Sequence, residues 1–271
     1  MVIIHVSLPA VTIRTLHSFS FDSGQVWPVL MPWALFAIGA AVFWAIGSWL
    51  RLPRASIGAL TLVGGLGNTS FVGLPMIESL QGRDGMGLGL LIDQLGSYLA
   101  LSTVGVFVAA LYSCDQRASG RAMALKVATF PPFVALVVAL LLRPLPLPVP
   151  LDSALARLGD TLAPLALLSV GLQLRFDALR SQARLLSIGL GYKLLACPAL
   201  VLMLLWLLEA RVDMTSRVSL IEAAMPPMIG AGIVAAEARL DAPLVSTMIG
   251  VGIPLGLSTA PLWHWLFAGA R

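Results

Sequence analysis

Charged residues are scarce in this chain. Asp, Glu, Lys and Arg make up 11% of its 271 residues, whereas 58% are hydrophobic. A soluble domain carries roughly 25% charged residues. Apolar runs of about 20 residues recur along the whole length, and such a run is long enough for a helix to cross a membrane. The composition argues against an ordinary soluble domain and predicts an all-α integral membrane protein.

Cysteine is equally scarce. Cys114 and Cys197 are the only two, one in a polar loop and one in an apolar run. They predict no disulfide framework and no metal site. The glycine-rich stretch 64–67 lacks the Lys-Ser/Thr of a phosphate loop, and the chain has no nucleophile elbow. We therefore expect no enzyme, no cofactor and no bound metal.

Basic residues are scattered singly through short loops, although the net charge is +4. There is no basic stripe with interleaved aromatic residues, so we expect no nucleic acid partner. Alternate loops differ in their Lys and Arg content, and the richer set, which includes Arg51, Arg54, Arg117 and Lys126, is expected to be cytoplasmic. This predicts a multi-pass protein of the cell inner (plasma) membrane, with its amino terminus inside and its carboxyl terminus outside.

The apolar runs predict nine membrane spans. Their approximate ranges are 2–17, 26–50, 56–80, 86–112, 124–142, 158–174, 184–208, 218–236 and 243–267. Residues 144–150, rich in proline, are expected to form a stiff connector.

Two of these spans carry helix-breaking residues. Residues 64–75 contain four glycines and Pro75, with Asn68, Thr69 and Ser70 at the centre, and residues 223–232 contain Pro226 and Pro227. Glycine weakens a helix and proline removes one hydrogen bond of its ladder. Such backbone is tolerated in a membrane only where protein or a water-filled cavity surrounds it. Paired broken helices are a pointer to the binding site of a transporter.

An internal repeat relates the two halves of the chain. Leu99–Thr103 (LALST) recurs as Leu255–Thr259 (LGLST), 156 residues later, and Pro9 matches Pro164 at an offset of 155. The equivalent spans are five crossings apart, so the two copies would face opposite ways in the membrane, as in inverted-repeat transporters.

The predicted domains are residues 1–112 (first repeat), 113–123 (a cytoplasmic loop) and 124–271 (second repeat). Only the second copy has a span before its repeated set. The nine spans therefore resemble a ten-span design that lacks its first helix, through a start-site error or a real loss.

The two interruptions supply the candidate binding residues. Amino-terminal ends of half-helices present unpaired N–H groups and suit a carboxylate. We therefore expect the anionic group of a substrate where the two broken helices cross; close helix packing is the alternative role of the glycines. The candidate substrate-binding residues are Asn68, Thr69, Ser70, Gly73, Pro75, Met225, Pro226 and Pro227.

Ionisable residues within spans are costly and usually functional. The candidates for coupling or charge balance are Asp93, Gln94, Lys193 and Glu222. In one interpretation Lys193 pairs with Asp93 or Glu222 in a balance that protonation or substrate alters. In the others the pair is static, Lys193 extends to the membrane surface, or Glu222 lies at the interface.

Several of these motifs resemble the auxin efflux carrier family of membrane transporters. The residues that carry the resemblance are Gly67–Pro75 (GNTSFVGLP), Asp93–Gly96 (DQLG), Ser169–Leu174 (SVGLQL), Lys193 and Ala223–Met228 (AAMPPM). The resemblance implies ten spans in two inverted repeats, with two broken helices crossing at the site as in bile-acid/sodium symporters. It also places Asn68 and Thr69 beside the substrate. The asparagine that plant members have at the second crossing has no clear counterpart near Pro226, and the short loop 113–123 favours a bacterial-type member.

The resemblance implies a secondary active transporter of small organic anions, carboxylates such as malate, malonate or auxin-like acids, that works by alternating access. A sodium-coupled symporter and a membrane-embedded binding or sensor protein without turnover are the alternatives. The expected partners are the organic anion, a proton or sodium ion and membrane lipid, and a homodimer is left open.

Overall fold

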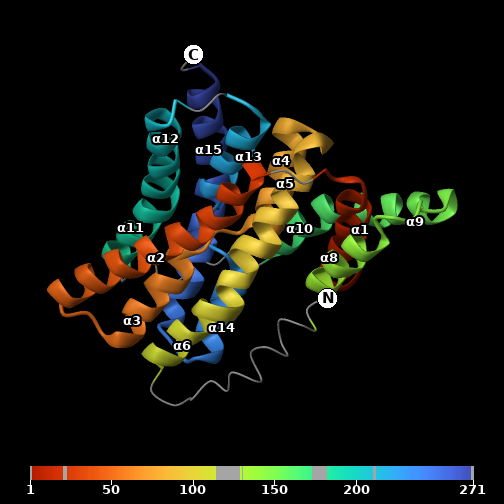
Figure 1. The fold of residues 1–271 in the computed structure, drawn as a ribbon. Helices are drawn as coiled ribbons and strands as arrows, with labels where there is room; N and C mark the ends of the chain where they lie inside the picture. Colours follow the sequence, from red (N-terminus) through yellow and green to blue (C-terminus); the bar gives the residue numbers. More distant parts are fainter. Residues whose placement is uncertain are drawn as a thin grey trace.

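The computed structural model describes residues 2–20, 23–113, 129, 131–172, 182–209 and 212–269. Throughout these ranges the ordered elements are helices, and the single β-type contact is one isolated bridge. The all-α class predicted from composition agrees with this architecture (Figure 1).

Four helical rods in the described ranges are long and apolar enough to cross a membrane: 23–49, 83–112, 183–207 and 242–267. The first combines η2 (Ser23–Gln25) and α2 (Val26–Trp49), and the last is α15 (Ala242–Gly269). The second joins η5 (Arg83–Gly85), α5 (Met86–Leu91), η6 (Ile92–Tyr98), η7 (Leu101–Gly105) and α6 (Val106–Tyr112). The third joins α11 (Ala183–Gly191), η8 (Tyr192–Ala196) and α12 (Cys197–Leu207).

Two further segments are interrupted near their middles, as the glycine and proline content predicts. The first consists of α3 (Arg54–Ala59) with η3 (Leu60–Gly64), followed by η4 (Thr69–Gly73) with α4 (Leu74–Gln81). The second consists of α13 (Met214–Ala223) and α14 (Ile229–Glu237). We call residues 65–68 the first break and residues 224–228 the second break. Each half is too short to span a bilayer alone.

The remaining helices gather on one side of the molecule (Figure 1). They are η1 (Ile3–Ser7), α1 (Leu8–Ser18), α8 (Pro131–Leu142), α9 (Val149–Gly159) and α10 (Leu162–Leu172). Helix α1 packs against α8 and α9. We call η1, α1 and α8–α10 the side group and the rest of the described helices the main group. The side group combines helices from both predicted repeats.

Helix α9 is one element that sequence reasoning missed. It begins at Val149, in the predicted proline-rich connector, and Pro150 lies in its first turn. Proline is well tolerated there because the first helical N–H groups have no partner within the helix. At 11 residues α9 is too short for a span. The count of nine spans stays a prediction.

The order of the helices repeats along the chain. Helices α1, α2 and α5 begin at Leu8, Val26 and Met86, and α10, α11 and α15 begin 154, 157 and 156 residues later. These intervals agree with the offset of the predicted duplication. The opposite orientation of the two copies in the membrane stays a prediction.

Large apolar side chains lie on the outside of the molecule as well as in its core. Trp44, Trp49, Phe107, Trp206 and Trp265 are all more than 60% exposed. A surface this apolar is unfavourable in water and favourable against lipid. With the four long apolar rods, it supports a protein that lies in the membrane.

Candidate functional site

The two breaks lie against each other. The backbone N–H of Asn68 donates to the carbonyl oxygen of Pro226 at 2.7 Å, and that of Met228 donates to Leu66 at 3.1 Å. Gly67 and Pro227 form the antiparallel bridge between them. Backbone groups freed by one break are thus satisfied by the other, which is what an apolar surrounding demands.

Asn68 closes the first break and starts the helix beyond it. Its side-chain oxygen Oδ1 accepts a hydrogen bond from the backbone N–H of Phe71 at 3.2 Å, as a helix-capping residue does. Asn68 is 1% exposed, and its amide nitrogen Nδ2 has no hydrogen-bond partner among the described residues. A buried amide donor is therefore left over at the crossing.

Asp93 lies against the amino-terminal end of η4, the half-helix that Asn68 caps. Its Oδ1 accepts hydrogen bonds from the hydroxyls of Thr69, at 2.6 Å, and Ser70. Asp93 comes from η6, on a different rod, and is 2% exposed. The amino-terminal end of a helix favours negative charge. The carboxylate of Asp93 therefore already compensates this helix end.

Lys193 places a positive charge at the helix end that precedes the second break. Its Nζ donates to the carbonyl oxygen of Ala223 at 3.1 Å, at the carboxyl-terminal end of α13. Cations are favoured at this end of a helix. Lys193 is 2% exposed and forms no ion pair with Asp93 or Glu222. The predicted ion pair is wrong, and so is the extended route to the surface, because the helix carbonyl provides a buried partner.

Helix α14 begins without such compensation. No side chain caps its first turn, since Met228 precedes it and cannot accept a hydrogen bond from the backbone as Asn68 does. Its nine residues point their amino-terminal end at the crossing. Of the two half-helices that start at the breaks, this one has no acidic side chain at its start.

Glu222 lies in the last turn of α13, and both of its carboxylate oxygens lack a hydrogen-bond partner among the described residues. It is 2% exposed, so it is buried inside the protein, and its position relative to the membrane interface stays a prediction. The fold of the broken segment places this turn deep between helices. A methyl group added at Gly73 would lie 2.5 Å from Oε2 of Glu222, which shows how closely η4 and α13 pack beside the breaks.

Gln94 connects the main group to the side group. Its Nε2 donates to the hydroxyl of Thr12 in α1 at 2.7 Å, and its Oε1 has no partner among the described residues. The side chain is buried next to Asp93 in the sequence. A relative movement of the two groups would break this contact.

The remaining predicted residues shape the crossing. Pro75 lies in the first turn of α4, where a missing N–H costs little. Met225 is fully buried. Pro226 and Pro227 pack against Gly256 and Gly252 of α15, positions where an added methyl would lie 2.7 and 2.6 Å from the proline rings.

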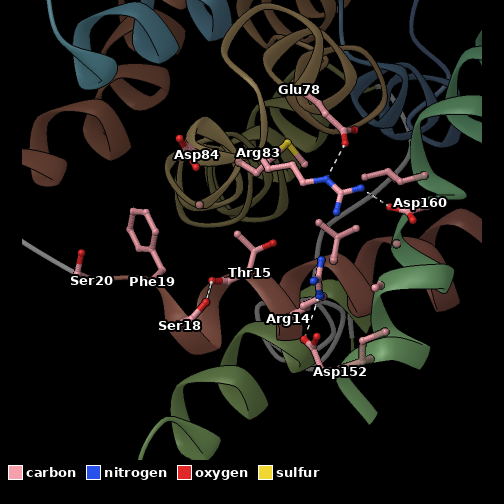
Figure 2. Close-up of a pocket in the computed structure, with 17 residues that line it drawn as sticks. Arg14, Thr15, Ser18, Phe19, Ser20, Glu78, Arg83, Asp84, Asp152 and Asp160 are labelled. Carbon is pink, nitrogen blue, oxygen red and sulfur yellow. Dashed lines mark hydrogen bonds and ion pairs between the residues drawn. The ribbon is translucent and has the colours of Figure 1, made fainter. Parts of the chain in front are cut away.

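A polar cavity of about 510 Å³ lies between the two groups (Figure 2). Two ion pairs cross or flank it: Arg14 Nε with Asp152 at 3.0 Å, and Arg83 Nη2 with Asp160 at 2.8 Å. Arg83 also lies 3.6 Å from Glu78. Sequence reasoning missed this cavity, because its charges come from segments far apart along the chain.

The lining of the cavity includes Val11 of α1 and Met86 of α5. Val11 directly precedes Thr12, the partner of Gln94. Met86 lies about two turns before Asp93 on the same rod. The residues that line the cavity thus belong to the same helices as Thr12 and Asp93, but neither Asn68 nor Asp93 is among them.

Comparison with known proteins settles the family. A sequence profile of the family described as membrane transport protein matches residues 114–264, more than half of the chain. The chain belongs to this family. The resemblance to auxin efflux carriers inferred from its motifs is confirmed.

Two archaeal relatives match over nearly the whole chain. An uncharacterized transporter of Methanothermobacter thermautotrophicus is 27% identical over 266 residues, which cover 97% of this chain and 86% of the relative. An uncharacterized transporter of Methanocaldococcus jannaschii is 23% identical over 275 residues, covering 98% and 87%. With the apolar rods, these matches support a multi-pass membrane transport protein.

Proposed function

We propose that this transport protein is a secondary active transporter of small organic anions, carboxylates such as malate, malonate or auxin-like acids. It binds the anion at the crossing of the two breaks and works by alternating access. The observation that carries the proposal is the pair of interrupted helices, joined by backbone hydrogen bonds between residues 66–68 and 226–228.

The uncompensated start of α14 is the proposed place of the substrate carboxylate. Its first-turn N–H groups point toward the crossing, and no side chain caps them. The amide Nδ2 of Asn68 supplies a second, buried donor without a partner in the described chain. Donors of this kind bind an anion strongly because the surroundings exclude water.

Asp93 restricts the proposed carboxylate site to the start of α14 and excludes the start of η4. It already compensates the start of η4 through Thr69 and Ser70, so a second anion there would meet a like charge. We therefore assign Thr69 and Ser70 to holding Asp93 in place rather than to direct contact with the substrate carboxylate. Asn68 remains the residue of the first break that faces the substrate in this proposal.

Access to the site requires a rearrangement. Asn68 and Thr69 are 1% and 2% exposed, so the crossing is closed in this conformation. The contacts between the side group and the main group include Gln94 with Thr12 and Arg83 with Asp160. A shift of one group against the other would open the cavity toward the crossing.

Exchange of labelled substrate tests this function. The purified protein is reconstituted in liposomes loaded with unlabelled malate, malonate or indole-3-acetic acid, and uptake of the same labelled acid is followed. We expect saturable counterflow with at least one acid and none in protein-free liposomes. Saturable binding without exchange would instead identify a binding or sensor protein.

A further inference from the structure

We propose that Glu222 is the site of a coupling proton that enters and leaves together with the organic anion. This inference rests on the proposed transport function and adds the identity and place of the coupled ion. It starts from an unusual side chain: a carboxylate at the second break that is 2% exposed and has no hydrogen-bond partner among the described residues.

The nearest neighbours of the two carboxylate oxygens are backbone and apolar side chains. Its oxygens face the backbone at Gly73 and Gly89, and the same space holds the side chains of Leu74 and Ile77. An ionised carboxylate in such surroundings is strongly disfavoured unless donors or a cation compensate it. Protonation removes that cost without any rearrangement.

Few acidic ligands for a metal ion lie near Glu222 in the described part of the chain. Hard cations in proteins are held by several oxygen ligands at once. In the described part of the chain, no cluster of three or more His, Cys, Asp and Glu side chains surrounds Glu222 or any other point. Lys193, which binds the carbonyl oxygen of Ala223 directly after Glu222, would also repel a cation there.

The charges around the crossing connect the proton to the substrate. Two other buried charged side chains lie at the crossing: Lys193 of η8, bound to the carbonyl oxygen of Ala223 next to Glu222, and Asp93 of η6, bound to Thr69 and Ser70. The ionisable side chains of α4 and η5 that pack near α13, namely Glu78, Arg83 and Asp84, line the outer cavity, and His264 of α15 contacts Gln81.

With Glu222 ionised, the three buried groups Asp93, Lys193 and Glu222 carry a net charge of −1, which opposes an incoming anion. With Glu222 protonated, they balance. Binding of the anion therefore favours binding of the proton, and the reverse holds to the same degree. Because the organic anion and the proton increase each other's binding affinity, the loaded transporter carries both in the same direction. The proposed coupling is therefore symport.

The test compares Glu222→Gln with the wild-type protein in liposomes, using malate and malonate. Glutamine keeps the size and imitates the protonated side chain. In the wild type, a pH gradient that is acidic outside should drive accumulation of the acid. In Glu222→Gln we expect counterflow to persist and accumulation driven by the pH gradient to be lost.

Glu209→Gln is the matched control, because it makes the same chemical change at an exposed residue. It should behave as the wild type. Accumulation driven by the pH gradient in Glu222→Gln, or accumulation in the wild type that follows a sodium gradient alone, would overturn the proposal. Absence of counterflow in the wild type would instead overturn the transport function itself.

A measurement on the wild type alone keeps the proposal testable even if the variant does not fold. Weakly buffered, detergent-solubilised protein should take up a proton when malate binds. Its Kd for malate should rise by up to about tenfold per pH unit above the transition, the limit for one linked proton. Malate binding without proton uptake, and with the same Kd from about pH 6.5 to about pH 9, where malate stays ionised, contradicts the assignment.

Discussion

The two breaks meet at one point but are built from different chemistry. The first break is rich in polar side chains: Asn68 caps the next half-helix, and Asp93 binds the hydroxyls of Thr69 and Ser70. The second break has two prolines and an uncapped half-helix. The protein thus satisfies the first break except for the amide Nδ2 of Asn68, whereas the half-helix after the second break starts without a side-chain cap.

The charged residues follow the same division. Asp93 lies at an amino-terminal helix end and Lys193 at a carboxyl-terminal one, so each charge is opposite to the helix dipole it meets. Glu222 has no such partner. The comparison teaches that Asp93 and Lys193 each stabilise a helix end at the crossing, whereas Glu222 does not, and Glu222 is the residue to which we assign the proposed proton.

Replacing Asp93 should have the largest effect of the changes considered. Asp93→Ala leaves the hydroxyls of Thr69 and Ser70, directly after the first break, without their acceptor, and we expect the free energy of unfolding to fall by about 2–4 kcal/mol. Lys193→Met removes one hydrogen bond to a carbonyl and should cost about 1 kcal/mol. Thermal and denaturant unfolding in detergent measure both. Equal losses would mean that the two breaks depend equally on their charges.

The next largest effect is expected from a replacement of Gly256, which packs behind the second break. Gly256→Ala places a methyl group 2.7 Å from the Cβ of Pro226, and the proline ring cannot move aside. We expect a loss of about 1–3 kcal/mol in the free energy of unfolding. Gly191→Ala, at a helical glycine with open space around it, is the control and should be neutral or slightly stabilising. A neutral Gly256→Ala would show that the second break can shift freely.

Two replacements of Asn68 separate capping from binding. Asn68→Ala removes the cap and should lower the free energy of unfolding by about 1 kcal/mol, whereas Asn68→Ser keeps a capping oxygen and should leave it nearly unchanged. Both remove the amide donor, so both should weaken substrate binding by about tenfold, which corresponds to one hydrogen bond to a charged group. Isothermal titration with the exchanged acid measures the Kd. Unchanged affinity in both variants would remove Asn68 from the site.

The smallest effect on stability is expected at the outer ends of the interrupted segments. After α4, Arg83 reaches Asp160 of the side group, whereas Asp241, after α14, accepts a hydrogen bond from Ser56 within the main group. Arg83→Gln should change the free energy of unfolding by about 0.5 kcal/mol or less, because the pair is exposed. It should alter the rate of substrate exchange, since it removes a contact between the groups.

Arg14→Gln is the control for this last variant. Arg14 and Asp152 line the same cavity but both belong to the side group (Figure 2). Arg14→Gln should therefore leave the rate of substrate exchange as it is in the wild type. If both arginine variants change the rate equally, the effect comes from the charge of the cavity and not from the contact between the groups.

Local chemistry along the chain determined much of this protein. Scarce charge and long apolar runs predict a helical membrane protein, and glycine and proline weaken a helix wherever they stand, so both breaks could be located from the sequence. The motifs around Asn68, Asp93 and Pro226 also identified the family.

Only the tertiary structure decided which partner each buried group takes. Asp93 lies 24 residues from Thr69 and Lys193 lies 30 from Ala223, and charge alone predicted an ion pair instead. Helix ends also attract charge, but where a helix end meets a side chain depends on packing. For the same reason the solitary position of Glu222 and the cavity beside Arg83 became visible only in three dimensions.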